Sequence, residues 1–168
     1  EMDLEAEPVP GGTIRLDWSA PLQPQVIVRY RIPGIGHPDR PIFDTIAALL
    51  GGRHGMLGSK LVGARPLAVS VQVDFRVIHI YRFGSPGVIN FVAMGRRDED
   101  LPAIELEILD VVGRLSQGQI DRAALERARK ALRLEWAQVR SDPGELAFQI
   151  GHFDTMDNFS SLLTHMEG

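Results

Sequence analysis

The sequence has no cysteine, few aromatic residues and no long apolar run. Without cysteine the chain forms no disulfide, no thiolate zinc site and no cysteine nucleophile. Aromatic residues are only 7% of the 168 residues, too few to suggest a stacking platform for single-stranded nucleic acid. The uninterrupted apolar runs are too short for a membrane-spanning helix, and no charged and then apolar leader indicates a signal peptide.

The charge balance excludes a second group of functions. Lys and Arg total 18 against 22 Asp and Glu, so the net charge is −4 and favours neither nucleic acid nor an anionic membrane. A hydrophobic fraction of 44% and a charged fraction of 24% are typical of a globular protein of one domain. The acidic, Pro- and Gly-containing stretch EMDLEAEPVPGG predicts a linker over 1–12, followed by a single domain over 13–168. Because the chain begins with Glu1, we expect the natural N-terminus to lie upstream.

Apolar residues alternate with other residues in several segments. This period of two predicts strands over 13–18, 25–32, 67–77 and 88–94, with a short strand or a continuation over 78–81. Within 25–32, Ile27, Arg29 and Arg31 fall on one face and the remaining apolar residues on the other. Gly84-Ser85-Pro86-Gly87 predicts a turn between the last two long strands.

Helical spacing of apolar residues marks the other segments. Asp39 before Pro41 predicts the start of a helix that Gly51-Gly52 ends, and a short helix follows over 56–64. Stripes over 101–115 and 125–139 predict two more helices, and Asp142 begins a third. The stripe expected on that third helix contains Leu146, Ile150, Phe153 and Leu163. This order predicts an α+β fold, a mostly antiparallel sheet with helices packed on one face.

A search for catalytic and metal-binding motifs finds none. Neither H-E-x-x-H nor H-x-x-E-H occurs, and His152 and Asp154 are two residues apart, which places them on different faces of a helix. No G-x-S-x-G is present, and no serine has an obvious base beside it in the sequence. We therefore predict no catalytic residue and no metal ligand in this chain. The residues considered are His37, His54, His79, His152, His165, Ser59, Ser70 and Ser85.

Two further patterns have ordinary structural explanations. The glycines over 34–36 and 51–55 match no phosphate-binding loop, so they predict a turn and a helix end. Basic residues gather in one helical stretch but are interleaved with acids, and Glu126 with Lys130 forms an i,i+4 pair. This predicts a solvated helix face, with a partner-binding patch as the alternative. The basic residues are Arg122, Arg127, Arg129, Lys130, Arg133 and Arg140.

The order of four segments resembles the pitrilysin/insulinase family of inverted-zincin metallopeptidases, over roughly 25–142. The helix 39–52 ends in Leu-Leu-Gly-Gly as in that family, and 54–57 stands where many members have Ser-Ser-Arg-Leu. The segment 66–69 matches the Gly-Leu-Ala-Tyr opening of a strand, and 121–129 is similar to a Thr-x-x-Glu-Leu-x-x-Ala-Lys helix.

The resemblance implies a non-catalytic, C-terminal-type half-domain. Members of that family are built from paired domains that close around a peptide, and one domain holds zinc through H-x-x-E-H and a downstream Glu. The motif is absent here, so the resemblance implies no cofactor in this chain and zinc in the catalytic domain of the parent protein. It also implies a catalytic half-domain, in the same or a partner chain, and a peptide substrate as partners. The compartment is unknown, and the periplasm or cell envelope is expected by resemblance.

Two positions bear on substrate binding. The partner domain of many members contributes an Arg and a Tyr, seven positions apart, that grip the substrate backbone. Those positions fall on Val62 and Val69, which cannot donate a hydrogen bond from the side chain. We therefore predict no substrate-gripping residue, a role as scaffold or chamber wall, and a core position on the strand for Val69.

Two alternatives remain. One is a structural or interaction module that has the same fold and no link to proteolysis. The other is an unrelated α+β domain whose pattern coincides with that of the family, since Leu-Leu-Gly-Gly and amphipathic helices are common.

Overall fold

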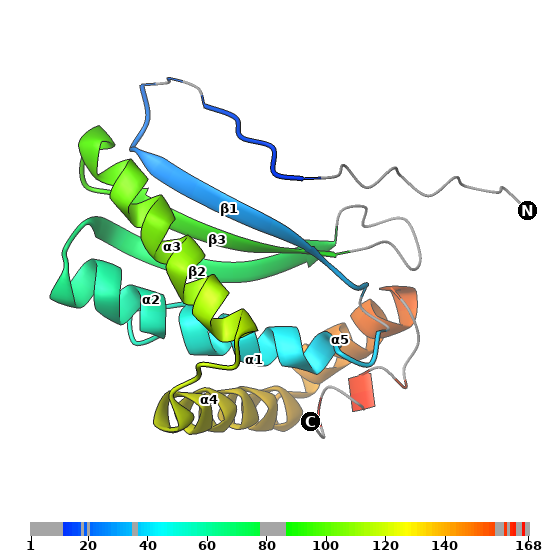
Figure 1. Ribbon diagram of the computed structural model, residues 1–168. Coiled ribbons are helices and arrows are strands. Elements are labelled where there is room, and N and C mark those ends of the chain that lie inside the picture. The colour runs from blue at the N-terminus through cyan, green and yellow to red at the C-terminus, as the bar shows by residue number, and fades with distance from the viewer. Residues whose placement is uncertain are drawn as a thin grey trace, which may run out of the picture.

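The computed structural model describes residues 12–17, 19, 21–34, 37–77, 87–156, 160, 162, 163 and 166. The predicted strand over 78–81, the turn over 84–87 except Gly87, and His79, Ser85 and His165 lie outside these residues. The described elements follow the chain as three strands and five α-helices, with two short helical turns of other types (Figure 1). The α+β class is confirmed.

Three antiparallel strands form the sheet: β1 (Gln25–Ile32), β2 (Ala68–Val77) and β3 (Gly87–Gly95). Their order is β1-β3-β2, so the last strand in sequence is the central one. All three were predicted, with ends shifted by at most one residue. β3 is buried along nearly its whole length because it has a neighbour on each side and helices over one face.

The predicted strand over 13–18 is wrong for the residues that are described. Residues 13–17 pair with no strand, and Ile14 and Leu16 are 67% and 79% exposed. Arg15 in the middle of this segment donates to Glu105 through Nη1, at 2.9 Å from each carboxylate oxygen. The alternation is real, but a strand needs a hydrogen-bonded neighbour, and this segment is tied to a helix instead.

The predicted helices are confirmed, with one difference. Gly51 ends α1, and Asp39 is its N-cap residue but makes no side-chain capping bond. The short helix predicted over 56–64 is divided into one α-helical turn and one π-helical turn, because the Arg65 amide donates back five residues to the Lys60 carbonyl oxygen. Asp142 caps α5 by accepting from the Gly144 amide at 2.8 Å. The helices are α1 (Arg40–Leu50), α2 (Met56–Gly58), η1 (Ser59–Ala64, the π turn), η2 (Asp98–Asp100, a 3₁₀ turn), α3 (Leu101–Ser116), α4 (Arg122–Ser141) and α5 (Pro143–Met156).

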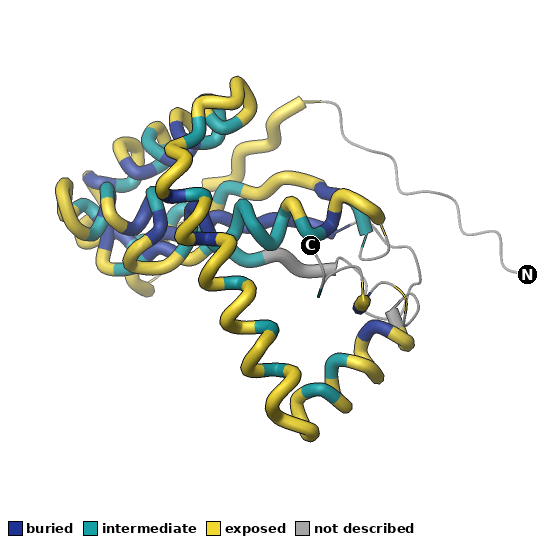
Figure 2. The backbone as a smooth tube through the Cα atoms, turned by 90° about the horizontal axis from the view of Figure 1, so that it is seen from below, coloured by how far each residue is buried: buried dark blue, intermediate teal, exposed yellow. Residues whose placement is uncertain are grey.

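Helices cover one face of the sheet, as predicted. α3 packs on β1 and β3, α1 and α2 pack on β2, and α4 lies outside α1 as a further layer (Figure 1). The core between sheet and helices includes the fully buried side chains of Leu50, Leu57, Leu61, Phe91, Ile104 and Ile108. Figure 2 shows that most residues of α4 and α5 are exposed. We call the face of the sheet opposite α1, α2 and α3 the open face.

The stripe predicted for the last helix is partly wrong. Phe153 is buried at 5% exposure against Trp136, but Ile150 and Leu163 are 37% and 44% exposed. The neighbouring Leu162 is buried instead, at 1% exposure. The apolar residues of α5 lie on more than one side of the helix, so spacing alone does not identify the packed side.

Candidate functional site

A glycine-rich turn connects α1 to α2 and η1. Gly52 has φ +68°, a left-handed conformation that glycine adopts without strain. A Cβ on Gly55 would lie 2.6 Å from the carbonyl carbon and oxygen of Leu50, and one on Gly58 would lie 2.9 Å from the carbonyl carbon of Gly52. The turn is therefore folded so tightly against the start of η1 that a Cβ on Gly55 or Gly58 would force the backbone to move.

The π turn η1 is held against α3 by ion pairs. Lys60 Nζ pairs with Glu107 Oε1, and its distance to Asp110 Oδ2 is 4.0 Å. Arg65 Nη1 lies 4.0 Å from the other carboxylate oxygen of Glu107. The Glu107 side chain is only 11% exposed, so this carboxylate depends on its two basic neighbours for stabilisation.

The structure separates the two positions where the resembling family has its Arg and Tyr. Val62, on η1, packs against the hydrophobic core. Val69 is 50% exposed, so its predicted core position is wrong. The register shifts between Ala68 and Ser70, which makes Val69 the extra residue of a β-bulge and turns it away from the core that holds Ala68 and Val71.

The open face carries a polar row that the sequence analysis did not identify. Arg29 Nε donates to Asn90 Oδ1 at 2.6 Å, and Asn90 Nδ2 donates to Asp74 Oδ1 at 2.8 Å. The three residues sit at the same level of the sheet, because Asn90 pairs with Arg29 on one side and with Asp74 on the other. The alternation in β1 indicated that Arg29 and Arg31 share a face. The sequence did not indicate the strand order that places Asn90 and Asp74 beside Arg29.

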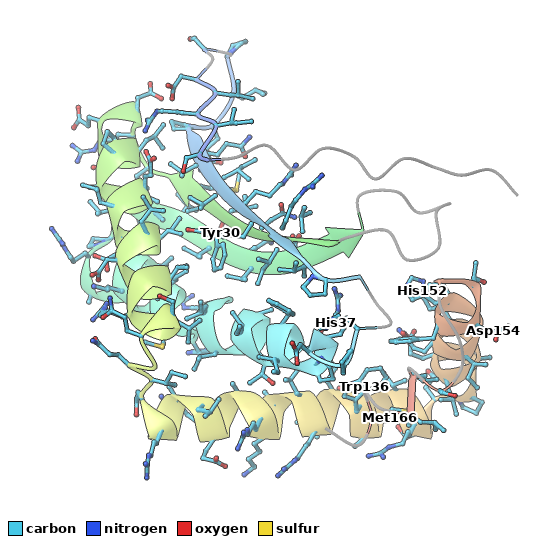
Figure 3. All side chains as sticks on the ribbon, turned by 45° about the vertical axis from the view of Figure 1, so that its right-hand side comes forward. Tyr30, His37, Trp136, His152, Asp154 and Met166 are labelled. Atoms are coloured by element: carbon cyan, nitrogen blue, oxygen red, sulfur yellow. The ribbon has the colours of Figure 1, made fainter. Side chains whose placement is uncertain are left out.

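Nothing in the described residues resembles a metal centre. No group of three or more His, Cys, Asp or Glu side chains there could hold a metal ion. Figure 3 shows His37 near the start of α1, whereas His152 and Asp154 lie on α5. The His152 ring stacks on Phe148 with centroids 6.2 Å apart, and His37 Nδ1 lies 3.7 Å from an Asp39 carboxylate oxygen. These described side chains do not fit a resident zinc ion.

In the described ranges, no hydrogen bond joins Ser59 or Ser70 to a histidine. His54 is exposed in the glycine-rich turn. None of the described helices is long and apolar enough to cross a membrane.

The basic stretch on α4 behaves as a solvated face with local ion pairs. Glu126 pairs with Arg129 at 3.4 Å, rather than with Lys130 as predicted, and Arg127 lies 4.0 Å from Asp121. A small cavity between α1 and α4 has a volume of about 30 Å³, which suits one or two water molecules but no substrate. Its lining includes Asp44, Arg129, Arg133 and Trp136.

Comparison with known families decides the identity of the fold. The model of the peptidase M16 inactive domain matches residues 3–132. The chain belongs to this family. The matched range contains the sheet, the helices α1, α2 and α3, and the first half of α4. The resemblance to the pitrilysin/insulinase peptidases, and to their non-catalytic half-domain, is thereby confirmed.

Individual relatives agree with this assignment. The chain is 27% identical over 115 residues to the zinc protease PqqE of Helicobacter pylori, a match that covers 68% of this chain and 23% of that protein. This chain therefore spans about a quarter of the length of the curated relative.

Solved structures share the fold of this M16 inactive domain. A protease from H. pylori superposes with a TM-score of 0.75 at 21% identity, covering 85% of this chain and 33% of that one. A Bordetella parapertussis structure described as an inactive peptidase domain gives a TM-score of 0.70 at 24% identity and covers 88% of this chain and 76% of that one. Likeness at these identities shows a common architecture.

Proposed function

We propose that this M16 inactive domain is the non-catalytic half of a zinc metallopeptidase, where it packs against a catalytic half-domain and forms part of the wall of a peptide-binding chamber. The match of the inactive-domain model over 3–132 carries the proposal. Zinc belongs to the catalytic domain in this scheme, since the described residues of this chain offer no fitting ligand set. The chain alone is then inactive.

The outer side of α3 provides a surface for packing against the catalytic half. Leu106 is 69% exposed and Leu109 is 42% exposed, although both are large apolar residues. Exposed Ile14 and Leu16 belong to the segment that Arg15 ties to the same helix. Apolar side chains gathered on one side of a domain are typical of an interface.

A binding experiment tests this packing. The chain is mixed with the catalytic half-domain of its parent protein, and association is measured by calorimetry and light scattering. We expect Leu106→Asp to weaken association, because it places a charge in the apolar contact. The matched control is Leu134→Asp on α4, where the replaced leucine is 60% exposed and lies elsewhere.

The outcomes are distinct. Equal binding by the two variants would show that α3 does not contact the catalytic half. Stoichiometric tight zinc binding, or peptide cleavage, by this chain alone would refute the non-catalytic role. A chain that associates with no catalytic half would favour the structural or interaction module instead.

A further inference from the structure

The open face of the sheet has a defined arrangement of side chains. Every second residue of each strand lies on it, and the strand register places these residues in rows that cross all three strands. Successive rows are about 7 Å apart, the distance spanned by two residues of an extended chain. From one end the rows are Gln25–Met94–Ser70, Ile27–Val92–Gln72, Arg29–Asn90–Asp74 and Arg31–Val88–Arg76.

Arg29 is held in place although it is exposed. Asn90 is only 4% exposed, and its amide bridges the Arg29 guanidinium to the Asp74 carboxylate. The Asn90 bond uses the Nε–H of Arg29, and a guanidinium has four other N–H donors on its terminal nitrogens. A planar fork that is already oriented loses less side-chain entropy when it binds a carboxylate.

The charge around this row is unlike that of the chain as a whole. Arg31 follows Arg29 on the same face of β1, and both arginines are exposed. Asp74 is the acidic residue in the row that contains Arg29. A protein of net charge −4 thus presents Arg29 and Arg31 beside a row in which Ile27 and Val92 are apolar and Gln72 is polar.

We propose that the open face binds extended peptide segments that carry an acidic side chain, with its carboxylate on Arg29. This rests on the proposed function, and it specifies the class of substrate that the chamber wall selects. An extended peptide lying along the strands places side chains i and i+2 on successive rows. The preferred segment therefore has an apolar residue, over Ile27 and Val92, two positions from a Glu or Asp over Arg29.

Fluorescence anisotropy with the full chain tests this preference. The probes are two labelled peptides of about eight residues, a strand's length, that differ only in Leu-Ala-Glu against Leu-Ala-Gln. We expect the Glu peptide to bind about fivefold more tightly at low salt, the factor for one exposed ion pair. Arg29→Gln is expected to abolish the difference, whereas Arg140→Gln, which removes an exposed charge from α4, retains it.

Three results would overturn the inference. They are equal affinity of the two peptides, an unchanged preference in Arg29→Gln, and loss of the preference in Arg140→Gln. Circular dichroism of each variant establishes that it is folded. Equal affinity of the parent chain for the two peptides, together with normal binding to the catalytic half, refutes only this inference. A Glu preference without binding to a catalytic half refutes only the proposed function.

Discussion

Alanine at Gly58 is a sharp test of the turn that leads into η1. Gly58 has φ −62° and ψ −45°, ordinary helical values that alanine adopts more readily than glycine. Backbone preference alone would make Gly58→Ala stabilising by about 0.5–1 kcal/mol. Any loss of stability must therefore come from the space around the new methyl group.

That space is filled by backbone. The methyl carbon would lie 2.9 Å from the carbonyl carbon of Gly52 and 3.1 Å from that of Arg53, and closer still to the Gly52 carbonyl oxygen. Ordinary contacts begin near 3.4 Å, so the Gly52 carbonyl group must move by more than about 1 Å. Overpacking of this kind costs about 1–3 kcal/mol, and here no flexible side chain can yield. We expect Gly58→Ala to lower the free energy of unfolding by about 2 kcal/mol.

Urea unfolding followed by far-UV circular dichroism measures the effect. Gly63→Ala is the matched control, because Gly63 lies in η1 and a methyl group there meets nothing within 4 Å. We expect it to be neutral or stabilising by up to about 1 kcal/mol. Faster hydrogen exchange at the Arg65 amide, which closes η1 onto Lys60, is a second expected consequence for Gly58→Ala. Equal stability of the two alanine variants would refute the close approach of residue 58 to the Gly52 backbone.

Three further substitutions probe the packing around the sheet. Lys60→Met leaves the largely buried Glu107 without its ammonium partner, and we expect urea unfolding to show a loss of about 1–2 kcal/mol. Arg97 donates to Asp100 at 2.9 and 3.0 Å and thereby lowers the pKa of that carboxyl, so the bond stabilises the fold above about pH 4 and is lost as the pH falls below it. Arg97→Gln is therefore expected to lower the urea midpoint at neutral pH and to converge with the parent in acid. Phe91→Ala empties a site that is 2% exposed, with an expected loss of about 3–5 kcal/mol in the same assay.

Each of these three predictions has a result that would contradict it. Arg114→Gln is the control for Lys60→Met, because Arg114 pairs with Asp110 on the exposed side of α3 and is expected to contribute less than about 1 kcal/mol. Equal losses in these two variants would show that Glu107 does not depend on Lys60. A pH-independent difference between Arg97→Gln and the parent would exclude the carboxylate of Asp100 as its cause. A loss below about 1 kcal/mol for Phe91→Ala would place Phe91 outside the core.

Most elements could be predicted because their apolar residues recur at a regular spacing and because a Gly or Pro residue marks where the element ends. Strand β1 has eight alternating residues before Pro33-Gly34, and its bounds were predicted without error. The segment 13–17 has an equally clear alternation but pairs with no strand. Alternation reports which side chains share a face, whereas a strand also requires a neighbour that the local sequence does not contain.

The candidate sites were less predictable because they depend on pairing. Val69 has the composition and spacing of a core residue, and the β-bulge that exposes it exists only in the register against β3. Likewise, Arg29, Asp74 and Asn90 come from three separate strands, and they meet because β3 inserts between β1 and β2. β2 and β3 follow one another in the chain and pair as expected, whereas β1 pairs with β3 and not with its sequence neighbour β2.

The register of β3 connects the open face to the core. Asn90 and Phe91 are adjacent, so they lie on opposite faces, and Phe91 packs edge to face with Tyr30 at a centroid distance of 6.0 Å. A shift of one residue would place Phe91 on the open face and Asn90 among buried apolar side chains, where its amide would lose both Arg29 and Asp74. The same pairing that buries the aromatic ring under the helices therefore orients Arg29 on the opposite side. The position of this arginine is determined by the core, which is the rigid support that a binding residue on a sheet requires.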